Sequence, residues 1–137
     1  MQSKTILLVD DNAIQATIRR TILERNGYTT ITALQPSRAL DYLRNSDTSS
    51  SVDLVITDHI MPGMNGSTFS KEIRNLNPAL PILVISGMEE ASEEYEGLHV
   101  EFRVKPLQPE LLLESVRQLI GIAQAPTPSP TLATATA

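Results

Sequence analysis

Residues 5–12 read TILLVDDN, a continuous run of apolar and β-branched residues that ends in two aspartates and an asparagine. Two similar runs follow, at residues 53–57 (DLVIT) and 81–85 (PILVI). Runs that stay apolar, rather than alternating with polar residues, are typical of central strands that are buried on both faces. The three runs therefore predict the centre of a parallel sheet with helices on both sides.

Weaker and more polar strand patterns at residues 28–33 and 101–104 predict the edges of the same sheet. Helical patterns separate the strands, so a strand and a helix alternate five times along the chain. Crossovers between parallel strands are right-handed almost without exception, which places helices on both faces of the sheet. The expected fold is α/β, a doubly wound five-stranded parallel sheet, and such sheets bind ligands beyond the carboxyl ends of their strands.

The first helix is expected to follow Asn12, a residue type that caps helix N-termini, and to stop at Gly27. Its apolar spacing predicts that Ile14, Ile18 and Ile22 face the sheet. Prolines open two of the other helices. The inner-face residues expected in these later helices are Ala39, Leu40, Leu43, Phe69, Ile73, Leu76, Leu112, Val116, Leu119 and Ile120. Residues 88–97 are predicted to hold a short, acidic helix.

Length and composition limit what the chain can do. Its 137 residues are the size of one domain, and the absence of cysteine excludes disulfide, zinc-ribbon and thiol chemistry. The net charge of −5 argues against nucleic-acid binding, and no apolar run approaches the ~20 residues that span a bilayer. We expect a cytoplasmic domain over residues 1–124 and a disordered Pro/Thr/Ala-rich tail or linker over residues 125–137.

Polar residues stand where the predicted strands end: Asp10 and Asp11 after the first, Asp58 after the third, Ser86 after the fourth and Lys105 after the fifth. If the strand order is 2-1-3-4-5, the first and third strands are neighbours and the three carboxylates converge. Adjacent negative charges repel one another unless their pKa values rise or a cation joins them. Hard oxygen ligands with open coordination positions suit Mg²⁺, which also accepts a phosphate oxygen.

The chemistry that fits this set of residues is phosphoryl transfer. An ionised aspartate can attack phosphorus to form an acyl phosphate and needs no general base. Because the transition state is loose, the protein mainly positions groups and neutralises the phosphoryl oxygens. Mg²⁺, the Lys105 ammonium and the Ser86 hydroxyl are the groups expected to neutralise them.

Four motifs occur in this order: VDDN at 9–12, TDHIMPGMNG at 57–66, ISG at 85–87 and VKPL at 104–107. In order and spacing they resemble the response-regulator receiver domain, the CheY-like fold, over about residues 4–122. The resemblance implies a flavodoxin/CheY-like sheet of order 2-1-3-4-5. It also implies a phospho-accepting module of two-component or phosphorelay signalling, which is not an enzyme in its own right although it assists its own phosphoryl transfer.

Carried over to this sequence, the resemblance makes Asp58 the phospho-acceptor and Lys105 the phosphoryl-binding lysine. Ser86 matches the switch hydroxyl, and Phe102 matches the aromatic residue whose inward rotamer follows that hydroxyl. Asp11 matches the direct metal ligand, and the Lys105–Pro106 bond resembles the family's cis peptide.

The remaining metal ligands implied by the resemblance are Asp10, Asp58 and the backbone carbonyl of Ile60, which together with Asp11 would hold Mg²⁺. The partners implied are a histidine kinase or histidine phosphotransfer protein and a downstream protein target, with no direct nucleic acid and no membrane. The donor is expected to dock on the first helix through a mainly apolar contact, with Asn12 and Gln15 at the mouth of the site. No output module is recognisable in residues 125–137, so output is expected through protein contacts, through onward phosphorelay, or in a portion that this sequence lacks.

Other functions fit the sequence less well. A haloacid-dehalogenase-like phosphatase needs a second aspartate two residues after the nucleophile, where this chain has Ile60 after Asp58. A flavodoxin-like cofactor binder needs a Ser/Thr/Gly-rich phosphate loop after the first strand, where this chain has two carboxylates. An unphosphorylated receiver that serves only as a scaffold remains open.

Three smaller features complete the expectations. His59 is interpreted as a solvent-facing loop residue. Ile60 and Met88 are apolar at the two positions that modulate dephosphorylation in the family, which predicts a long-lived phosphoryl group.

Residues 89–103 hold six acidic residues and one arginine, and so carry the whole net charge. This window is either a solvated face or a docking face for a basic partner.

Overall fold

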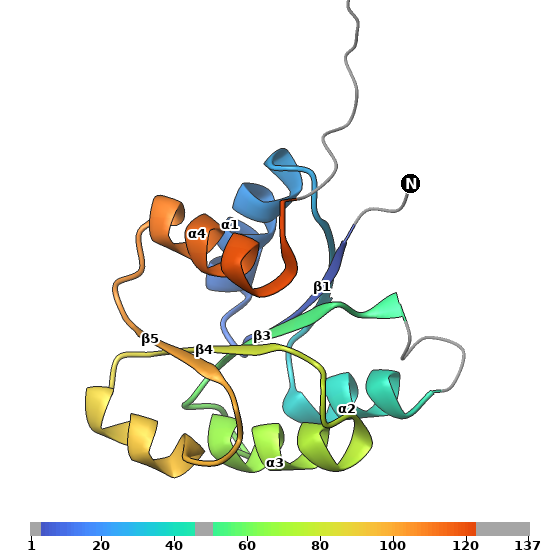
Figure 1. Ribbon diagram of the computed structural model, residues 1–137, viewed down its shortest axis with the longest axis vertical. Coiled ribbons are helices and arrows are strands. Elements are labelled where there is room, and N and C mark those ends of the chain that lie inside the picture. The colour runs from blue at the N-terminus through green and yellow to red at the C-terminus, as the bar shows by residue number, and fades with distance from the viewer. Residues whose placement is uncertain (1–3, 46–50, 123–137) are drawn as a thin grey trace, which may run out of the picture.

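The computed structural model describes residues 4–45 and 51–122, which form one five-stranded parallel sheet (Figure 1). The strands are β1 (Thr5–Val9), β2 (Thr29–Ala33), β3 (Leu54–Asp58), β4 (Ile82–Ser86) and β5 (Glu101–Val104). Their order in the sheet is β2-β1-β3-β4-β5. This order confirms the predicted doubly wound fold and places β1 beside β3.

Helices cover both faces of the sheet (Figure 1). One layer holds α1 (Ala13–Arg25) and α4 (Pro109–Ile120), and the other holds α2 (Pro36–Arg44), α3 (Gly66–Leu76) and the 3₁₀ helix η2 (Glu89–Tyr95). Two hydrophobic clusters fill the spaces between the sheet and these layers. The continuous apolar runs of β1, β3 and β4 supply both clusters, as expected for strands that are buried on both faces.

Successive residues of a strand point to opposite faces, so residue parity decides which layer a side chain meets. Leu54 and Ile56 of β3 pack with the α1 and α4 cluster, whereas Val55 packs with the α2 and α3 cluster. By the same alternation, Asp58 belongs on the α1 face of the sheet, and His59, which follows it, belongs on the η2 face. This separation decides the surroundings of both residues.

The predicted inner face of α1 was wrong for Ile14 and Ile18, whereas Ile22 is partly buried and packs against the core as expected. Ile14 and Ile18 are 75% and 55% exposed, while Ala16, Arg19 and Leu23 are buried. The inward face thus follows the spacing i, i+3, i+7 from Ala16. The physical reason is that this phase brings Arg19 onto the buried carboxylates at the ends of β1 and β3, to which it forms ion pairs.

Other differences from the expectations are smaller. The acidic segment after β4 forms the short helix that was predicted, and it is a 3₁₀ helix of seven residues. Leu76 at the end of α3 is exposed. The Lys105–Pro106 peptide bond is cis, as the resemblance implied. Among the described residues, no helix has the length and apolar character needed to cross a bilayer. The predicted tail, residues 125–137, lies outside the described part of the chain.

Candidate functional site

The pairing of β1 with β3 brings two aspartates together at the carboxyl edge of the sheet. Val9 is in register with Thr57, so Asp10 and Asp58 leave the two strands side by side. Oxygens of Asp10, Asp11 and Asp58 all lie within 4.8 Å of one another. They line a pocket of about 220 Å³, together with Ser86 and Lys105. The five side chains that the sequence placed at strand ends therefore do meet.

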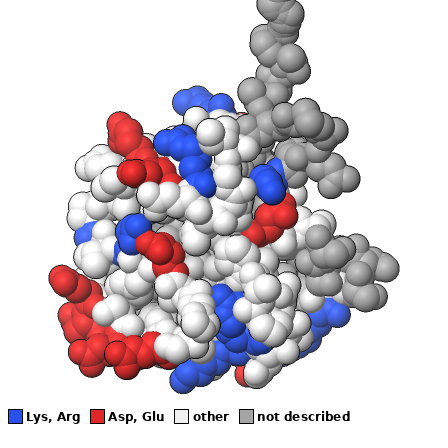
Figure 2. Space-filling view, viewed as in Figure 1, with Lys and Arg blue, Asp and Glu red and all other residues white. Residues whose placement is uncertain are grey.

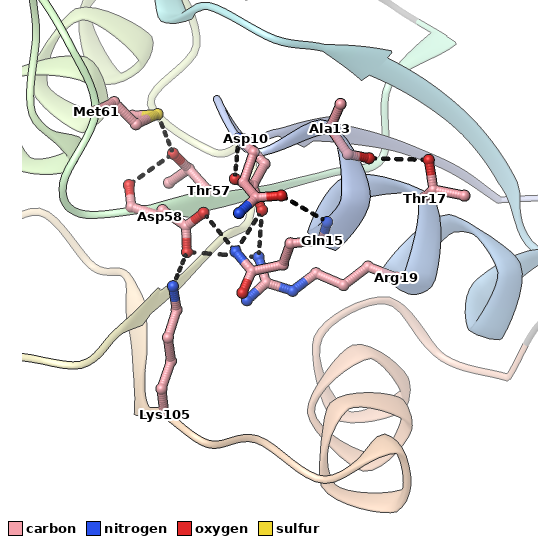
Figure 3. A network of polar contacts seen from close by, with 10 residues as sticks. Asp10, Ala13, Gln15, Thr17, Arg19, Thr57, Asp58, Met61 and Lys105 are labelled. Carbon is pink, nitrogen blue, oxygen red and sulfur yellow. Dashed lines mark hydrogen bonds and ion pairs between the residues drawn. The ribbon is translucent and has the colours of Figure 1, made fainter.

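Asp58 is 3% exposed, and both of its carboxylate oxygens have partners (Figure 3). Its Oδ1 lies 3.0 Å from the Lys105 ammonium and 3.5 Å from an Arg19 guanidinium nitrogen. Its Oδ2 accepts a hydrogen bond of 3.1 Å from the Gln15 side-chain amide. Three nitrogen donors from two elements therefore surround one carboxylate.

Asp10 shares two of these donors. Its Oδ2 accepts hydrogen bonds from Gln15 Nε2 at 2.6 Å and from Arg19 at 3.2 Å, and its Oδ1 accepts one from the backbone N–H of Asn12 at 2.9 Å. Asn12 in turn caps α1, because its side-chain oxygen accepts from the Gln15 N–H. The cap fixes the start of the helix, and Gln15 and Arg19 follow one turn apart on the face that meets the carboxylates.

The surroundings of Asp58 stabilise its neutral, protonated form more than water does. Burial of the carboxyl, helped by the neighbouring Asp10, raises the pKa of Asp58 from 3.8 to about 6. The positive charges of Arg19 and Lys105 act in the opposite direction and do not cancel this rise. Asp58 is therefore ionised, and able to act as a nucleophile, above about pH 6.

The other predicted site residues lie around this group with different degrees of exposure. Asp11 and Ile60 are exposed at the rim of the pocket, where the Ile60 side chain faces solvent. Ser86 is buried, and its hydroxyl accepts a hydrogen bond from the Met88 N–H at 3.0 Å. Phe102 is half-buried and packs against Tyr95, with ring centroids 5.5 Å apart.

His59 is buried, so its assignment as a solvent-facing loop residue was wrong. Its Nδ1 shares a hydrogen bond of 2.7 Å with the Tyr95 hydroxyl, and its Nε2 lies 3.6 Å from the Glu94 carboxylate. Alternation directs His59 to the face that η2 covers, and burial raises the pKa of the Tyr95 phenol. The same Glu94 accepts a hydrogen bond from Ser67 at the start of α3.

Sequence reasoning missed one residue of the site, Arg19. It is 8% exposed and bridges Asp10 and Asp58. A signal was present, since Arg19 stands one helical turn after Gln15, which was expected at the mouth. The evenly spaced isoleucines of the first helix concealed it, because their spacing indicated a different inner face.

The donor set fits a hard divalent cation. The carboxylate oxygens of the three residues lie within 4.8 Å of one another and are hard ligands. One of the three residues is exposed, which leaves room for water. The acidic cluster Asp10, Asp11 and Asp58 could therefore bind a metal ion.

Comparison with known proteins identifies the family of the chain. The family model of the response regulator receiver domain matches residues 6–117. The chain belongs to this family. It is a receiver domain of two-component response regulators, a signalling module, with the α/β flavodoxin-like fold of CheY-like proteins.

Relatives of this receiver domain include both regulators and single domains. The uncharacterized transcriptional regulatory protein YbdJ of Bacillus subtilis is 29% identical over 122 residues, which are 88% of this chain and 52% of that protein. The chemotaxis protein CheY4 of Vibrio cholerae has a TM-score of 0.76 at 27% identity, covering 86% of this chain and 99% of that chain. A chain from the CheX–CheY–BeF3–Mg²⁺ complex of Borrelia burgdorferi has a TM-score of 0.76 at 25% identity, covering 84% and 87%.

The receiver domain corresponds to only part of many relatives. It spans between 18% and 52% of the length of YbdJ, the Arabidopsis thaliana regulator ARR13 and the Salmonella typhimurium regulator ZraR.

Proposed function

We propose that this receiver domain accepts a phosphoryl group on Asp58 from a histidine kinase or a histidine phosphotransfer protein and passes the signal on through protein contacts. The observation that carries the proposal is the convergence of a buried nucleophilic carboxylate, a lysine ammonium 3.0 Å from it and two further carboxylates in one pocket. Sheets of this topology bind ligands at this edge.

In the proposed step, an oxygen of the ionised Asp58 attacks the phosphorus of a phosphohistidine. The new O–P bond forms while the P–N bond breaks, and the bond's electron pair stays on the histidine nitrogen, which takes up a proton. Lys105 binds the phosphoryl oxygens, since its ammonium already lies against Asp58 Oδ1. Ser86 lines the same pocket and offers a hydroxyl to the new group.

We propose Mg²⁺ as the metal ion of the site. Asp10, Asp11, Asp58 and the backbone carbonyl of Ile60 would hold it. When bound, it neutralises charge on the phosphoryl oxygens. Asp11 is the exposed carboxylate of the cluster, and so the one that a hydrated ion meets first.

The proposed output begins on the opposite face of the sheet. Ser86 would move toward the phosphoryl group and Phe102 would turn inward, which changes the surface around β5 and η2. Phe102 already packs against Tyr95 of η2, so a rotation of its ring would be felt there. We propose that residues 1–124 act as this signalling module in the cytoplasm, and that they are not an enzyme for another substrate.

The phosphoryl donor is proposed to dock beside α1. The exposed Ile14 and Ile18 lie on this helix, and Ile18 also lines a groove with Pro106 and Leu107. This apolar surface borders Lys105 and Gln15, which also line the site. A donor histidine could therefore approach Asp58 while its carrier rests on apolar residues.

The proposal is tested by incubating the chain with acetyl phosphate and Mg²⁺ at pH 8 and measuring its intact mass. We expect a gain of ~80 Da, the mass of one phosphoryl group. The gain should be absent from Asp58→Asn and present in Asp41→Asn, a matched control at an exposed carboxylate on α2. An unchanged mass in the unmodified chain, or a gain that persists in Asp58→Asn, would contradict the assignment.

A further inference from the structure

We propose that Arg19 is a resident cation of the phosphorylation site, which weakens Mg²⁺ binding to the free receiver and stabilises the phosphorylated one. The inference rests on the proposed function. It assigns a role to a residue that lies outside the motifs which identify the family, and it follows from where α1 places a permanent positive charge.

Arg19 lies against the carboxylates of the site and is 8% exposed. Its guanidinium is buried, and the same NH1 nitrogen lies 3.2 Å from Asp10 Oδ2 and 3.5 Å from Asp58 Oδ1. Figure 3 shows the side chain reaching from α1 to these two carboxylates, while Lys105 reaches Asp58 from another direction. The two cations therefore do not occupy the same position.

Arginine suits this position because it stays charged at every relevant pH and forms several directional hydrogen bonds. A buried charge is tolerated when it is paired, and Arg19 forms ion pairs with two carboxylates of the site, Asp10 and Asp58. Its neighbours on the inner face of α1, Ala16 and Leu23, are apolar. The arginine is thus the charged residue that the buried face of this helix presents to the sheet.

Formal charge shows what Arg19 changes. In the free site, three carboxylates face two cations, Arg19 and Lys105, which leaves a charge of −1. Adding a divalent ion makes the site +1, whereas it would be neutral without Arg19. Phosphorylation replaces one carboxylate charge with a phosphoryl charge of about −2, so the metal-loaded site becomes neutral with Arg19 and −1 without it.

Arg19 should therefore affect two ligands in opposite directions. It repels a divalent cation that binds beside the carboxylates, and it attracts the added negative charge of a phosphoryl group. Opposite directions separate this role from a structural one. Loss of a purely structural contact would disorder the pocket and weaken both ligands together.

The experiment measures two dissociation constants by titration calorimetry at pH 8, where Asp58 is ionised. The first is for Mg²⁺ alone. The second is for beryllofluoride, a phosphoryl mimic, at saturating Mg²⁺. We expect Arg19→Met to bind Mg²⁺ about tenfold more tightly and beryllofluoride about tenfold more weakly than the unmodified chain. Arg19→Lys keeps the charge and should stay within about threefold of the unmodified chain for both ligands.

Arg20→Met is the matched control, because Arg20 is exposed on the same helix and pairs with Glu24. Both constants should stay within about twofold in this variant. Arg19→Gln is a second neutral variant, which decides the result if circular dichroism shows that Arg19→Met is unfolded. Weakening of both ligands, or no change in either, would overturn the role of Arg19 while leaving Asp58 as the acceptor. If the unmodified chain binds neither ligand, the proposed function and this inference both fail.

Discussion

Asp58 and His59 are consecutive residues at the end of β3, but they contact different elements. Asp58 faces α1 and His59 faces η2. On the α1 side, Asp58 is surrounded by charged and amide donors, Arg19, Lys105 and Gln15. On the η2 side, His59 meets the Tyr95 hydroxyl and ring, in a region where the packing is close. Asp58 is thus held mainly by ion pairs, whereas the next residue, His59, is held by a ring contact and a hydrogen bond with Tyr95 and lies near a single carboxylate, Glu94.

The two sides of β3 should therefore tolerate different substitutions. Charge on the α1 side must balance among buried groups, so a change of ligand or protonation state alters it directly. Most charges of η2 face solvent, and Figure 2 shows an acidic patch over this segment, while Glu94 also lies 3.6 Å from the buried His59. Its inward contacts are the buried Ala91 and Tyr95. We therefore expect α1 variants to change ligand affinity and η2 variants to change stability.

The largest loss of stability is expected for Gly66→Ala, because Gly66 lies where η2 approaches the end of β3. A Cβ at this position would lie 2.3 Å from the Tyr95 hydroxyl and 2.6 Å from the Asp58 carbonyl oxygen. Because one of these neighbours is backbone, the strain cannot be relieved by a side-chain rotation alone. We expect the free energy of unfolding to fall by about 3 kcal/mol in urea denaturation.

Gly87→Ala is the control for this prediction, because a Cβ there meets no atom within 4 Å. Its free energy of unfolding should change by less than ~0.5 kcal/mol. Equal effects of the two substitutions would show that the approach of Gly66 to the end of β3 does not limit the packing.

On the α1 side, the substitution Asp58→Asn is expected to have the opposite effect. In EDTA, it should increase the free energy of unfolding. The folded state raises the pKa of Asp58 from 3.8 to about 6, so it binds a proton more tightly than the unfolded chain does. Stability from this group is therefore present below about pH 4 and is lost as the pH rises to about 6. The asparagine variant avoids this loss and should be more stable at pH 7 by about 3 kcal/mol, since each unit of pKa difference is worth about 1.4 kcal/mol.

The measurement is urea denaturation of both chains between pH 4 and pH 7. The advantage of Asp58→Asn should grow through this range and level off above about pH 6. A difference that is independent of pH would show that Asp58 has an ordinary pKa in the folded state.

The smallest effect on stability is expected for Tyr95→Phe, a substitution on the η2 side. The variant keeps the ring packing against Phe102 and removes the 2.7 Å hydrogen bond to the buried His59. We expect a loss of about 1 kcal/mol in the free energy of unfolding. The Mg²⁺ dissociation constant should stay within about twofold, and a larger change would show that the two sides are coupled.

Much of the site could be predicted from the sequence because strand ends are marked locally. Apolar runs that stop at Asp10, Asp58 and Ser86 reveal both the strands and the polar residues that follow them. Parallel topology then brings these ends to one edge. The cis bond at Lys105–Pro106 was likewise expected from the resemblance, and it is present.

The errors share one cause, which is that burial depends on what covers a residue. Ile14 and Ile18 have the spacing of a buried face, yet they are exposed because α1 turns Arg19 toward the carboxylates instead. His59 follows a strand end and was expected in solvent, yet η2 covers it. The partners that decide these outcomes are distant in the sequence, since Arg19 and Asp58 are 39 residues apart and His59 and Tyr95 are 36 residues apart.

Apolar runs, caps and prolines act over a few residues, so the amino-acid sequence alone specifies the sheet, the order of its elements and the residues at the strand ends. The rotation of α1, the burial of His59 and the pairing of Arg19 with Asp10 and Asp58 arise only when the chain is folded. These outcomes depend on charges and surfaces that meet across 9 and 39 residues of chain. A local sequence pattern does not show which distant residue a buried charge will pair with.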